Sequence, residues 1–562
     1  MVKIIKHTAS MQTRDDVRLD ADIYRPDTDE KLPILLMRQP YGREIASTVV
    51  YAHPNWYASH GYIVVIQDVR GRGTSEGEFD LFTHEVNDGL DTIDWVLSLP
   101  HNTGMVGMYG FSYQGMTQLY TASAKPDCLK AIAPAMVAYD LYTDWAYENG
   151  AFCLFANLAW AIQLAGETAR IKGDEAAYLK FKAAFSNLPL QGSIPANPEL
   201  MRELASDSFY HQWLDNRDPN AEYWQERSPK YLLDKVDLPM LHVGGWFDPY
   251  LRGTMNLYRT MTSQCQQPQH LLVAPWAHLP WGRKLGAVDY GMEAQNPIDE
   301  IQIRWFDHWL KNIDTGLLKE APISLFEMGS NSWQEFETLP DKQTTYYLAS
   351  DGLASMREDS GMLWQEETAT ELSACELLET NLSEVVTEFD NSTDVLVHDP
   401  WRPVPALGGH ATFPSGSFER SHLDCRSDVL TYTSAPLESD LHLVGAITLE
   451  VYCTSENSSF DLCAVLSTVT DNKVYNFTQG YIRVQAIDNV RVVAIAFQPT
   501  CMCIKAGESL RLSLSPACYP AYPVNSGTRK LPHESRQIDN QIITIKIHSG
   551  ADRPSKLMIN TA

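Results

Sequence analysis

The sequence predicts an α/β domain with a helical insertion, followed by an all-β domain. In residues 1–138 and again in 236–338, short and nearly continuous apolar runs alternate with helical patterns, as in parallel strands covered by helices. Residues 139–235 carry helical patterning rich in Trp, Tyr, Ala and Leu. Residues 339–562 show short runs of period-two alternation separated by Gly, Pro, Asn and Asp, which favours a β-sandwich or jelly roll.

Length and charge narrow the classes of function. A chain of 562 residues is too long for one ordinary core, so about two to four structural units are expected. Lys and Arg together number 44 and Asp and Glu 71, which gives a net charge of −27. Because phosphate backbones and anionic membrane surfaces attract basic proteins, this balance argues against nucleic acid and membrane partners.

The chain shows neither a targeting signal nor a metal-binding pattern. Residues 1–7 contain no apolar stretch of a signal peptide, and the longest apolar stretch, residues 151–165, is shorter than the ~20 residues of a membrane span. The ten cysteines are scattered without C-x-x-C pairs, and we interpret Cys501 and Cys503 as core thiols. We therefore expect a cytoplasmic protein without a metal site.

The expected elements of the first part of the core follow in order. Residues 12–26 predict a hairpin with its turn at Asp15 and Asp16. Three apolar runs then predict three strands, and a helical pattern lies between the second and the third run. The strands are expected at residues 32–37, 62–67 and 105–109, and the helix at 86–99. This β-α-β alternation is the architecture of an α/β-hydrolase core.

The rest of the chain divides at turn-rich sequence. Residues 139–235 are interpreted as a cap of helices without strands, inserted into the core. The core is expected to resume with strands and to close with a helix that begins near Pro297. Those strands are expected at residues 239–244 and 270–274, and the later β runs at 443–452, 460–470, 490–497, 510–514 and 541–547.

Ser112 is the candidate nucleophile. It lies between the apolar run that ends at Tyr109 and a stretch of good helix formers, so the chain is expected to turn sharply at the serine. At the start of a helix, backbone N–H groups and the dipole favour developing negative charge. The usual elbow is G-x-S-x-G, whereas here the second glycine is Gly115, one place later. The pattern alone also fits an ordinary Gly-Ser loop.

An acid and a base follow the serine in catalytic order. A serine hydroxyl needs an adjacent base, and the base needs an acid that fixes its tautomer. Asp248 stands just beyond one predicted strand and His278 just beyond the next, so we interpret them as orienting acid and general base. His242 and His308 are rival bases, but the first lies inside a strand and the second in a helix.

Attack on a carbonyl creates an oxyanion that needs two preorganised donors. The residue after the nucleophile, Tyr113, is expected to supply its backbone N–H. Tyr41 follows the strand at 32–37, where the second donor normally lies. From the residues alone, its hydroxyl is equally compatible with a donor role and with loop packing.

Several motifs together resemble one known family. The chain is similar to the cocaine esterase and X-prolyl dipeptidyl peptidase family of α/β-hydrolases, which includes α-amino acid ester hydrolases and glutaryl acylases. The resemblance covers nearly the whole chain, and the displaced glycine of the elbow is that family's own form. The motifs are DVRL at 16–19, RQPY at 38–41, QDVRGRGTSEG at 67–77, GFSYQG at 110–115, GWFD at 245–248 and PWAH at 275–278.

The resemblance implies roles for particular residues. It implies a hydrolase core, a helical cap and a C-terminal jelly roll, with no metal or organic cofactor. It also implies an aromatic acyl pocket between core and cap. The chain departs from the family at 410–413, where His-Ala-Thr-Phe replaces a bulky apolar pair. The implied site residues are Ser112, Asp248 and His278 as triad, Tyr41 and Tyr113 as oxyanion donors, and Trp145, Trp160 and Tyr250 as pocket.

Three hypotheses on function follow. The first is a serine hydrolase that cleaves small-molecule carboxylic esters, or amides, through an acyl-enzyme. The second is an X-prolyl dipeptidyl peptidase or α-amino acid ester hydrolase, which binds a free α-ammonium through carboxylates near the acyl pocket. The third is a binding protein on a hydrolase scaffold, against which a complete triad argues. A homodimer through edge strands is compatible with the sequence. The carboxylates available to the second hypothesis are Asp144, Glu148, Asp289 and Glu293.

Overall fold

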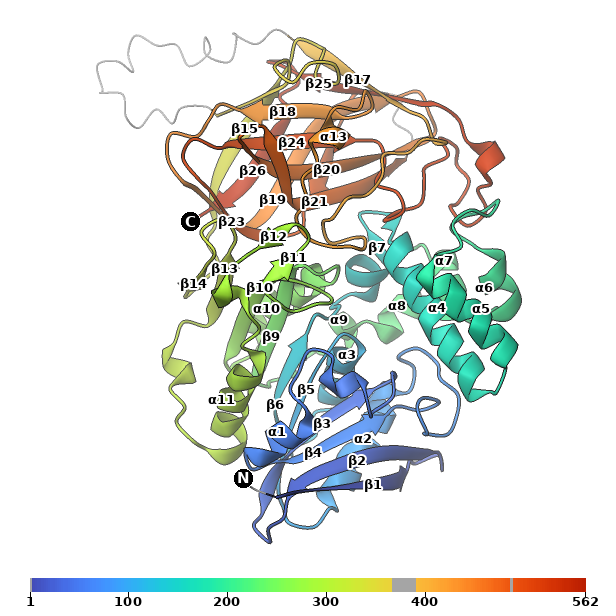
Figure 1. The fold of residues 1–562 in the computed structure, drawn as a ribbon, viewed down its shortest axis with the longest axis vertical. Helices are drawn as coiled ribbons and strands as arrows, with labels where there is room; N and C mark the ends of the chain where they lie inside the picture. The colour runs from blue at the N-terminus through green and yellow to red at the C-terminus, as the bar shows by residue number, and fades with distance from the viewer. Residues whose placement is uncertain (1–2, 366–390, 486–488) are drawn as a thin grey trace.

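The computed structural model describes residues 3–365, 391–485 and 489–562. A ten-stranded sheet forms the centre of the core, in the order β1-β2-β4-β3-β5-β6-β9-β10-β13-β14 (Figure 1). The strands from β4 to β13 are parallel, while β1, β2 and β14 pair antiparallel at the two edges. The strands are β1 (Ile4–Gln12), β2 (Arg18–Pro26), β3 (Leu32–Gln39), β4 (Ile63–Asp68), β5 (Asn102–Phe111), β6 (Leu129–Ala135), β9 (Met240–Phe247), β10 (Gln269–Ala277), β13 (Ile323–Glu327) and β14 (Ser332–Phe336).

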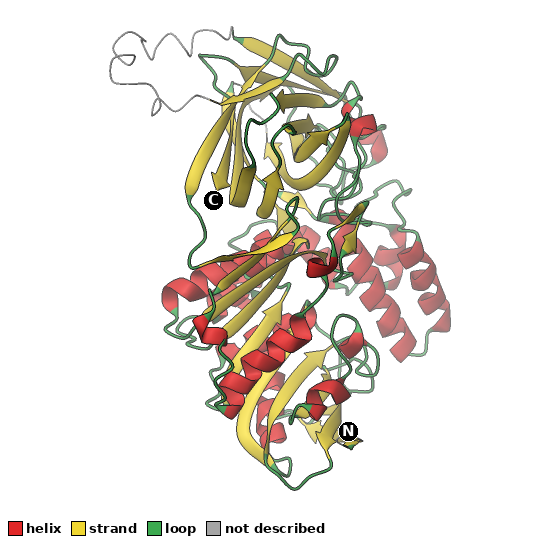
Figure 2. Ribbon diagram, turned by 60° about the vertical axis from the view of Figure 1, so that its left-hand side comes forward, coloured by secondary structure: helices red, strands yellow, loops and turns green. Residues whose placement is uncertain are grey.

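Helices cover both faces of this sheet, as Figure 2 shows. Helices α1 and α11 pack on one face, and α2, α3 and α10 on the other. Every residue of β4 is buried, which is why the parallel strands read as continuous apolar runs. The predicted α/β-hydrolase core is therefore confirmed. The helices are α1 (Pro54–Ser59), α2 (Glu85–Leu97), α3 (Tyr113–Ser123), α10 (Leu251–Gln264) and α11 (Ile298–Lys311); short elements are η1 (Ala46–Thr48), β11 (Lys284–Leu285), β12 (Val288–Asp289), η3 (Met292–Ala294) and η4 (Leu317–Lys319).

The inserted cap lies beside the core and is mostly helical (Figure 1). The expectation of a cap without strands is wrong, because β7 (Tyr147–Glu148) and β8 (Ala151–Phe152) form a small hairpin. Asn149 and Gly150 both have positive φ, the conformation that a tight hairpin turn requires. The other cap elements are the π-helix η2 (Tyr142–Ala146), α4 (Leu154–Ile171), α5 (Glu175–Ser186), α6 (Glu199–Leu204), α7 (Phe209–Asp215), α8 (Glu222–Arg227) and α9 (Pro229–Leu232).

The C-terminal domain is built from antiparallel strands, apart from the parallel pair β16 and β18. The predicted β runs correspond to β19, β20, β22, β24 and β25, and the sequence reading missed the others. In β21, for example, Asn476, Thr478 and Gln479 are buried, which hides the apolar alternation. The elements are β15 (Lys342–Ala349), β16 (Met362–Gln365), β17 (Ser392–His398), α13 (Ser421–Asp424), β18 (Leu430–Ser434), β19 (Leu441–Ser455), β20 (Ser459–Thr470), β21 (Lys473–Gln485), β22 (Arg491–Ala496), β23 (Thr500–Ile504), β24 (Ser509–Ser515), η7 (Gln537–Asp539), β25 (Ile543–Ser549) and β26 (Lys556–Thr561).

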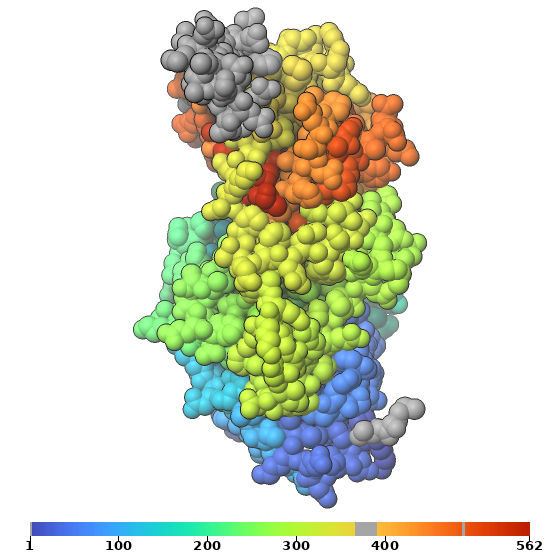
Figure 3. Space-filling model, turned by 90° about the vertical axis from the view of Figure 1, so that its left-hand side faces the viewer, coloured from blue at the N-terminus to red at the C-terminus, as the bar shows by residue number. Residues whose placement is uncertain are grey.

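The C-terminal domain stacks directly on the second part of the core (Figure 3). Backbone hydrogen bonds join the two: Met328, just after β13, donates to Cys501 over 3.0 Å and accepts from Cys503 over 2.8 Å. Cys501 and Cys503 are buried, as expected of core thiols, whereas Cys375 lies outside the described residues. Within the described part of the chain, no helix has the length and apolar character needed to cross a membrane.

Glu148 of the cap is hydrogen-bonded to residues of both the core and the C-terminal domain. This buried cap residue accepts hydrogen bonds from Arg252 of α10, over 2.9 Å, and from His410 and Tyr522 of the C-terminal domain. Burial opposes its ionisation, but the charges of Arg252 and His410 prevail and lower the pKa of Glu148 to about 2. The cap is therefore fastened to both neighbours by one ionised carboxylate.

We predict that Glu148→Gln lowers the melting temperature at neutral pH. Leaving Arg252 buried without its counter-charge costs about 3–5 kcal/mol. Because the pKa of Glu148 is depressed in the fold, its contribution is present above its ordinary value of 4.5 and disappears as the pH falls toward about 2. Calorimetry across this range should show the two proteins converging in acid. Glu293→Gln, at an exposed site, is the control, and an unchanged melting temperature in E148Q would contradict the prediction.

Candidate active site

Ser112 stands at a sharp turn between β5 and α3. Its backbone has φ 60° and ψ −128°, a left-handed conformation that a non-glycine residue rarely adopts. The turn is fixed by the backbone N–H of Ser112, which donates to the Ala135 carbonyl of β6 over 2.9 Å. Gly110 precedes it with φ 139°, where a Cβ would lie 2.5 Å from the Cβ of Gln114. The strand–serine–helix geometry of an elbow is thus present.

The displaced glycine has a packing reason. A Cβ on Gly115 would lie 2.4 Å from Cγ1 of Val137 and 2.9 Å from the Ala135 carbonyl oxygen. Helix α3 and the end of β6 therefore approach each other most closely at Gly115. The place that glycine takes in the usual elbow is occupied here by Gln114, whose side chain accepts a hydrogen bond from the Phe111 N–H over 3.3 Å.

Three residues from the ends of β5, β9 and β10 form a continuous hydrogen-bonded chain. The Ser112 hydroxyl lies 3.0 Å from Nε2 of His278, and Nδ1 of His278 lies 2.8 Å from Oδ1 of Asp248. Asp248 is completely buried, while the His278 side chain is 29% exposed. Burial raises the pKa of Asp248, and the hydrogen bond from His278 opposes that rise. The arrangement is chemically suited to removing a proton from the serine.

The sequence-predicted oxyanion donors both lie at the serine. The Tyr41 hydroxyl accepts a 3.1 Å hydrogen bond from Nε1 of Trp160 and is hydrogen-bonded to Ser112. Burial raises the pKa of Tyr41 to about 12, so at neutral pH it retains the proton that a donor needs. Buried Arg72 places a positive charge near this hydroxyl. Tyr113 donates its own hydroxyl to Glu85 over 2.7 Å, which leaves its backbone N–H, at the first position of α3, as the group near the serine.

The three pocket residues predicted by resemblance lie together. The rings of Trp145 and Trp160 stack at 5.0 Å, and the Tyr250 ring lies 4.1 Å from that of Trp145. Tyr250 in turn packs edge-on against the His278 ring at 4.9 Å. All three side chains are buried, and the Trp145 indole N–H has no hydrogen-bond partner among the described residues. The catalytic histidine candidate therefore borders a continuous aromatic surface.

Sequence reasoning missed several residues of this surface. Phe82 stacks on the Tyr113 ring at 4.8 Å and also faces the Trp160 ring, while Phe111 and Trp281 pack on each other beside His278. The indole of Trp281 donates to the His278 carbonyl over 3.2 Å. Phe111 and Trp281 were within reach of a sequence signal, because Phe111 directly precedes Ser112 and Trp281 follows His278 by three positions.

Of the four carboxylates available to the second hypothesis, three are paired within the protein and one is exposed. Asp144 accepts from the N–H groups of residues 139 and 140 and from Asn256, so its role is to cap a turn. Glu148 is held by Arg252 and His410, as described above. Asp289 pairs on the surface with Arg283, and Glu293 is exposed. The departure at 410–413 thus buries His410 against Glu148 and leaves Phe413 71% exposed.

The two alternative candidates for the general base, His242 and His308, lie in other elements of the core. His242 lies inside β9, bonded to Gln269 over 2.9 Å, and burial lowers its pKa to about 4. His308 lies on α11. In the described ranges, Glu327, His442 and Cys503 also bring three potential metal ligands within 4.8 Å. Glu327 is already paired with His442 over 2.7 Å, and the Lys505 ammonium, hydrogen-bonded to Cys503, would repel a cation.

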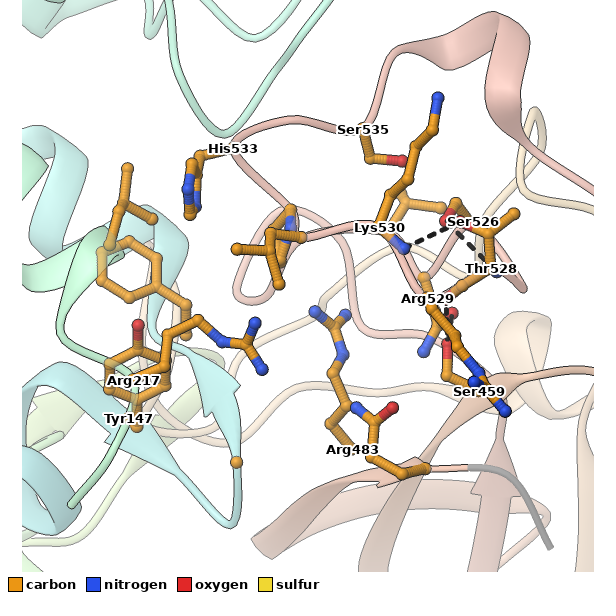
Figure 4. Close-up of a pocket in the computed structure, with 18 residues that line it drawn as sticks. Tyr147, Arg217, Ser459, Arg483, Ser526, Thr528, Arg529, Lys530, His533 and Ser535 are labelled. Carbon is orange, nitrogen blue, oxygen red and sulfur yellow. Dashed lines mark hydrogen bonds between the residues drawn. The ribbon is translucent and has the colours of Figure 1, made fainter. Parts of the chain in front are cut away.

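A small cavity of about 70 Å³ lies between the cap and the C-terminal domain. Figure 4 shows Arg217 of the cap and Arg483 of β21 pointing toward one another in it. Arg483 is already paired with Asp461 over 2.7 Å, and Lys530, which also lines the cavity, is paired with Asp539 over 2.9 Å. The charges of Arg483 and Lys530 are therefore compensated within the protein.

Comparison with known proteins bears on this site. The family model described as X-Pro dipeptidyl-peptidase (S15 family) matches residues 15–280, and that of the X-Pro dipeptidyl-peptidase C-terminal non-catalytic domain matches residues 315–558. A relative named cocaine esterase, from Rhodococcus sp. (strain MB1 Bresler), is 28% identical over 578 residues, covering 97% of this chain and 96% of the relative.

Solved structures share the whole fold. An aminopeptidase from a marine sediment archaeon, Thaumarchaeota archaeon, superposes with a TM-score of 0.81 at 20% identity, and an α-amino acid ester hydrolase with 0.76 at 19%. Both alignments cover 100% of this chain and 97% of the other. At such identities the likeness concerns the fold.

We predict that Gly115→Ala disturbs the elbow without removing any polar group. The new methyl would overlap Val137 and the Ala135 carbonyl, and such overpacking costs about 1–3 kcal/mol. Relief by shifting α3 would move Ser112, so covalent labelling of the serine by a fluorophosphonate should slow. Gly192→Ala is the control, since a Cβ there has no neighbour within 4 Å. Equal labelling rates in the two variants would refute the packing account of Gly115.

Proposed function

We propose, from the premise that this chain is a member of the X-Pro dipeptidyl-peptidase (S15) family of serine hydrolases, that it hydrolyses small-molecule carboxylic esters through an acyl-enzyme on Ser112. One observation carries the proposal. The side chains of Ser112, His278 and Asp248 are joined by consecutive hydrogen bonds of 3.0 and 2.8 Å. The Rhodococcus relative is named an esterase, which supports this choice of substrate.

Acylation begins at His278. Its Nε2 takes the proton of the Ser112 hydroxyl as Oγ attacks the ester carbonyl carbon, while Asp248 holds the proton on Nδ1 and stabilises the imidazolium. The carbonyl becomes a tetrahedral oxyanion. When the bond to the alcohol oxygen breaks, the imidazolium returns its proton to that oxygen, and the acyl group remains on Ser112.

Deacylation repeats these steps with water. His278 removes a proton from a water molecule that attacks the acyl carbon. The bond between the acyl carbon and Ser112 Oγ then breaks, the imidazolium returns its proton to Oγ, and the acid is released. In both steps the oxyanion accepts hydrogen bonds from the Tyr41 hydroxyl and the Tyr113 N–H. A charge that develops in this water-poor site is strongly stabilised by such fixed donors, and buried Arg72 adds a favourable field.

The surroundings of the triad offer one site for the acyl group of the ester and another for its alcohol. The aromatic surface of Trp145, Trp160 and Tyr250 suits an apolar or aromatic acyl group. A cavity of about 360 Å³ lies beside Tyr41, bounded by helices α4 and α5 of the cap. We assign this cavity to the alcohol, because it adjoins the oxyanion donor from outside the aromatic surface.

The second hypothesis, recognition of a free α-ammonium, needs a carboxylate with uncompensated charge. Asp144 and Glu148 are the candidates that lie in the cap near the aromatic residues, and both are engaged by protein donors. The contacts therefore favour esters without a free amine. A panel containing p-nitrophenyl acetate, a benzoyl ester, a phenylglycine ester and Gly-Pro-p-nitroanilide separates the two, since preference for the last two substrates would support the second hypothesis.

We predict that Ser112→Ala abolishes ester turnover and labelling by a fluorophosphonate. Without Oγ no acyl-enzyme forms, so the expected loss in kcat is about 10⁶-fold, by precedent for triad serines. The measurement is release of p-nitrophenol at saturating ester. Undiminished turnover in the S112A protein would exclude the serine mechanism, and wild-type protein that neither turns over the panel nor labels at Ser112 would favour a binding protein.

We predict that Tyr41→Phe lowers kcat about 10²–10³-fold while KM changes little, because the lost donor acts on the oxyanion and not on the ground-state carbonyl. The phenyl ring keeps the bulk of the side chain, although the Trp160 indole N–H also loses its acceptor. The control is Tyr231→Phe, because Tyr231 is an exposed tyrosine of α9 that does not line this cavity. If the Y41F variant kept a wild-type kcat, the oxyanion assignment of Tyr41 would have to be abandoned.

A further inference from the structure

The turn that carries Asp248 receives a side chain from the C-terminal domain. The amide Nε2 of Gln498 donates to the Asp248 carbonyl over 2.7 Å and to the Trp246 carbonyl over 3.3 Å. These two carbonyls flank Phe247, the last residue of β9. Both amide protons are thus directed at the backbone where β9 ends and Asp248 follows, and Gln498 itself is only 1% exposed.

Gln498 is held rigidly in its own domain. Its N–H donates to the Gln479 carbonyl over 3.0 Å, and its carbonyl accepts from the Thr478 hydroxyl over 2.7 Å. Two residues later the chain enters β23, which is bonded to Met328 at the end of the core strand β13. The Gln498 side chain therefore projects from a fixed backbone, and its hydrogen bonds hold the turn at Asp248 in a fixed position relative to the C-terminal domain.

The core holds the same turn from the other side. The Trp246 indole donates to the Phe326 carbonyl of β13 over 2.7 Å, and the Asp248 N–H donates to Gly245 over 3.0 Å. These bonds fix the strand end. The Asp248 carbonyl accepts a 3.2 Å hydrogen bond from the Leu251 N–H of α10 and the shorter, 2.7 Å bond from Gln498. Fixing this carbonyl fixes the peptide plane that follows Asp248 and therefore the position of the Cα from which its side chain projects.

We propose that Gln498 is a positioning residue that aims the catalytic acid Asp248 at His278. The inference rests on the proposed function, in which Asp248 fixes the tautomer of His278. Gln498 touches neither substrate nor reacting atoms and acts through the backbone of Asp248. The C-terminal domain, although matched by a family model described as non-catalytic, thereby contributes to the alignment of the triad.

Gln498→Met tests this proposal, because it keeps an unbranched side chain of similar length and removes both donors. A misaligned acid should lower kcat about ten- to a hundredfold with little change in KM, since a shift of about 1 Å near the chemistry has effects of that order. Gln498→Asn, too short to span both carbonyls, should show a smaller loss and provides a second variant if the methionine protein folds poorly.

Gln269→Met is the matched control. Gln269 is also buried, and its Nε2 also bridges two backbone carbonyls, of Leu238 and Gln267, at 3.0 and 3.1 Å, but at the opposite end of β9 and β10. Its loss should lower the melting temperature and leave kcat unchanged. A purely structural role of Gln498 would give the same result as this control.

A double-mutant cycle with Asp248→Ala isolates the coupling. If Gln498 acts through the acid, Q498M should have no further effect on the residual kcat of the D248A protein. Equal rate losses in both backgrounds, or a wild-type kcat in Q498M, would overturn the inference. Failure of the proposed function is distinguishable, because Ser112→Ala or Asp248→Ala would then leave turnover intact, whatever Gln498 does.

Discussion

The hydrogen bond between Asp248 and His278 is the constraint on which the rest of the site depends. A fully buried carboxylate is costly to ionise, and its 2.8 Å contact with His278 is the interaction that opposes this cost. The contact exists because β9 and β10 are parallel neighbours in the sheet, so that the residues beyond their carboxyl ends meet. The order β5-β6-β9-β10 then brings Ser112 to the same edge.

This logic explains why the side chains of the proposed nucleophile, acid and base could be expected from the sequence to lie together. Each stands immediately beyond a buried parallel strand, and such strands have a local signature of continuous apolar residues. Their mutual distance follows from the topology of the sheet and needs no knowledge of long-range contacts. Gly115 could be noticed in the sequence because it stands one place beyond the usual glycine of the elbow. The reason for a glycine there, the close approach of α3 to Val137, is seen only in the packing.

The remaining site residues have no comparable signal. Phe82 and Gln498 contribute through partners that are dozens to hundreds of positions away, and nothing in their neighbouring sequence marks them. The cap hairpin at 147–152 escaped notice because its strands are only two residues long. The sequence shows that four carboxylates are available. Whether the charge of each is free depends on partners such as Arg252, which are distant in the sequence.

The contacts of Glu148 link the architecture to substrate choice. A cap carboxylate near an aromatic pocket would attract a cationic substrate if its charge were uncompensated. Here Arg252 from the core pairs with it, and His410 and Tyr522 from the C-terminal domain are hydrogen-bonded to it. His410 occupies the segment where the chain departs from its family. The docking of three domains around one carboxylate therefore leaves Glu148 engaged by protein partners, which agrees with the proposed preference for an apolar acyl group.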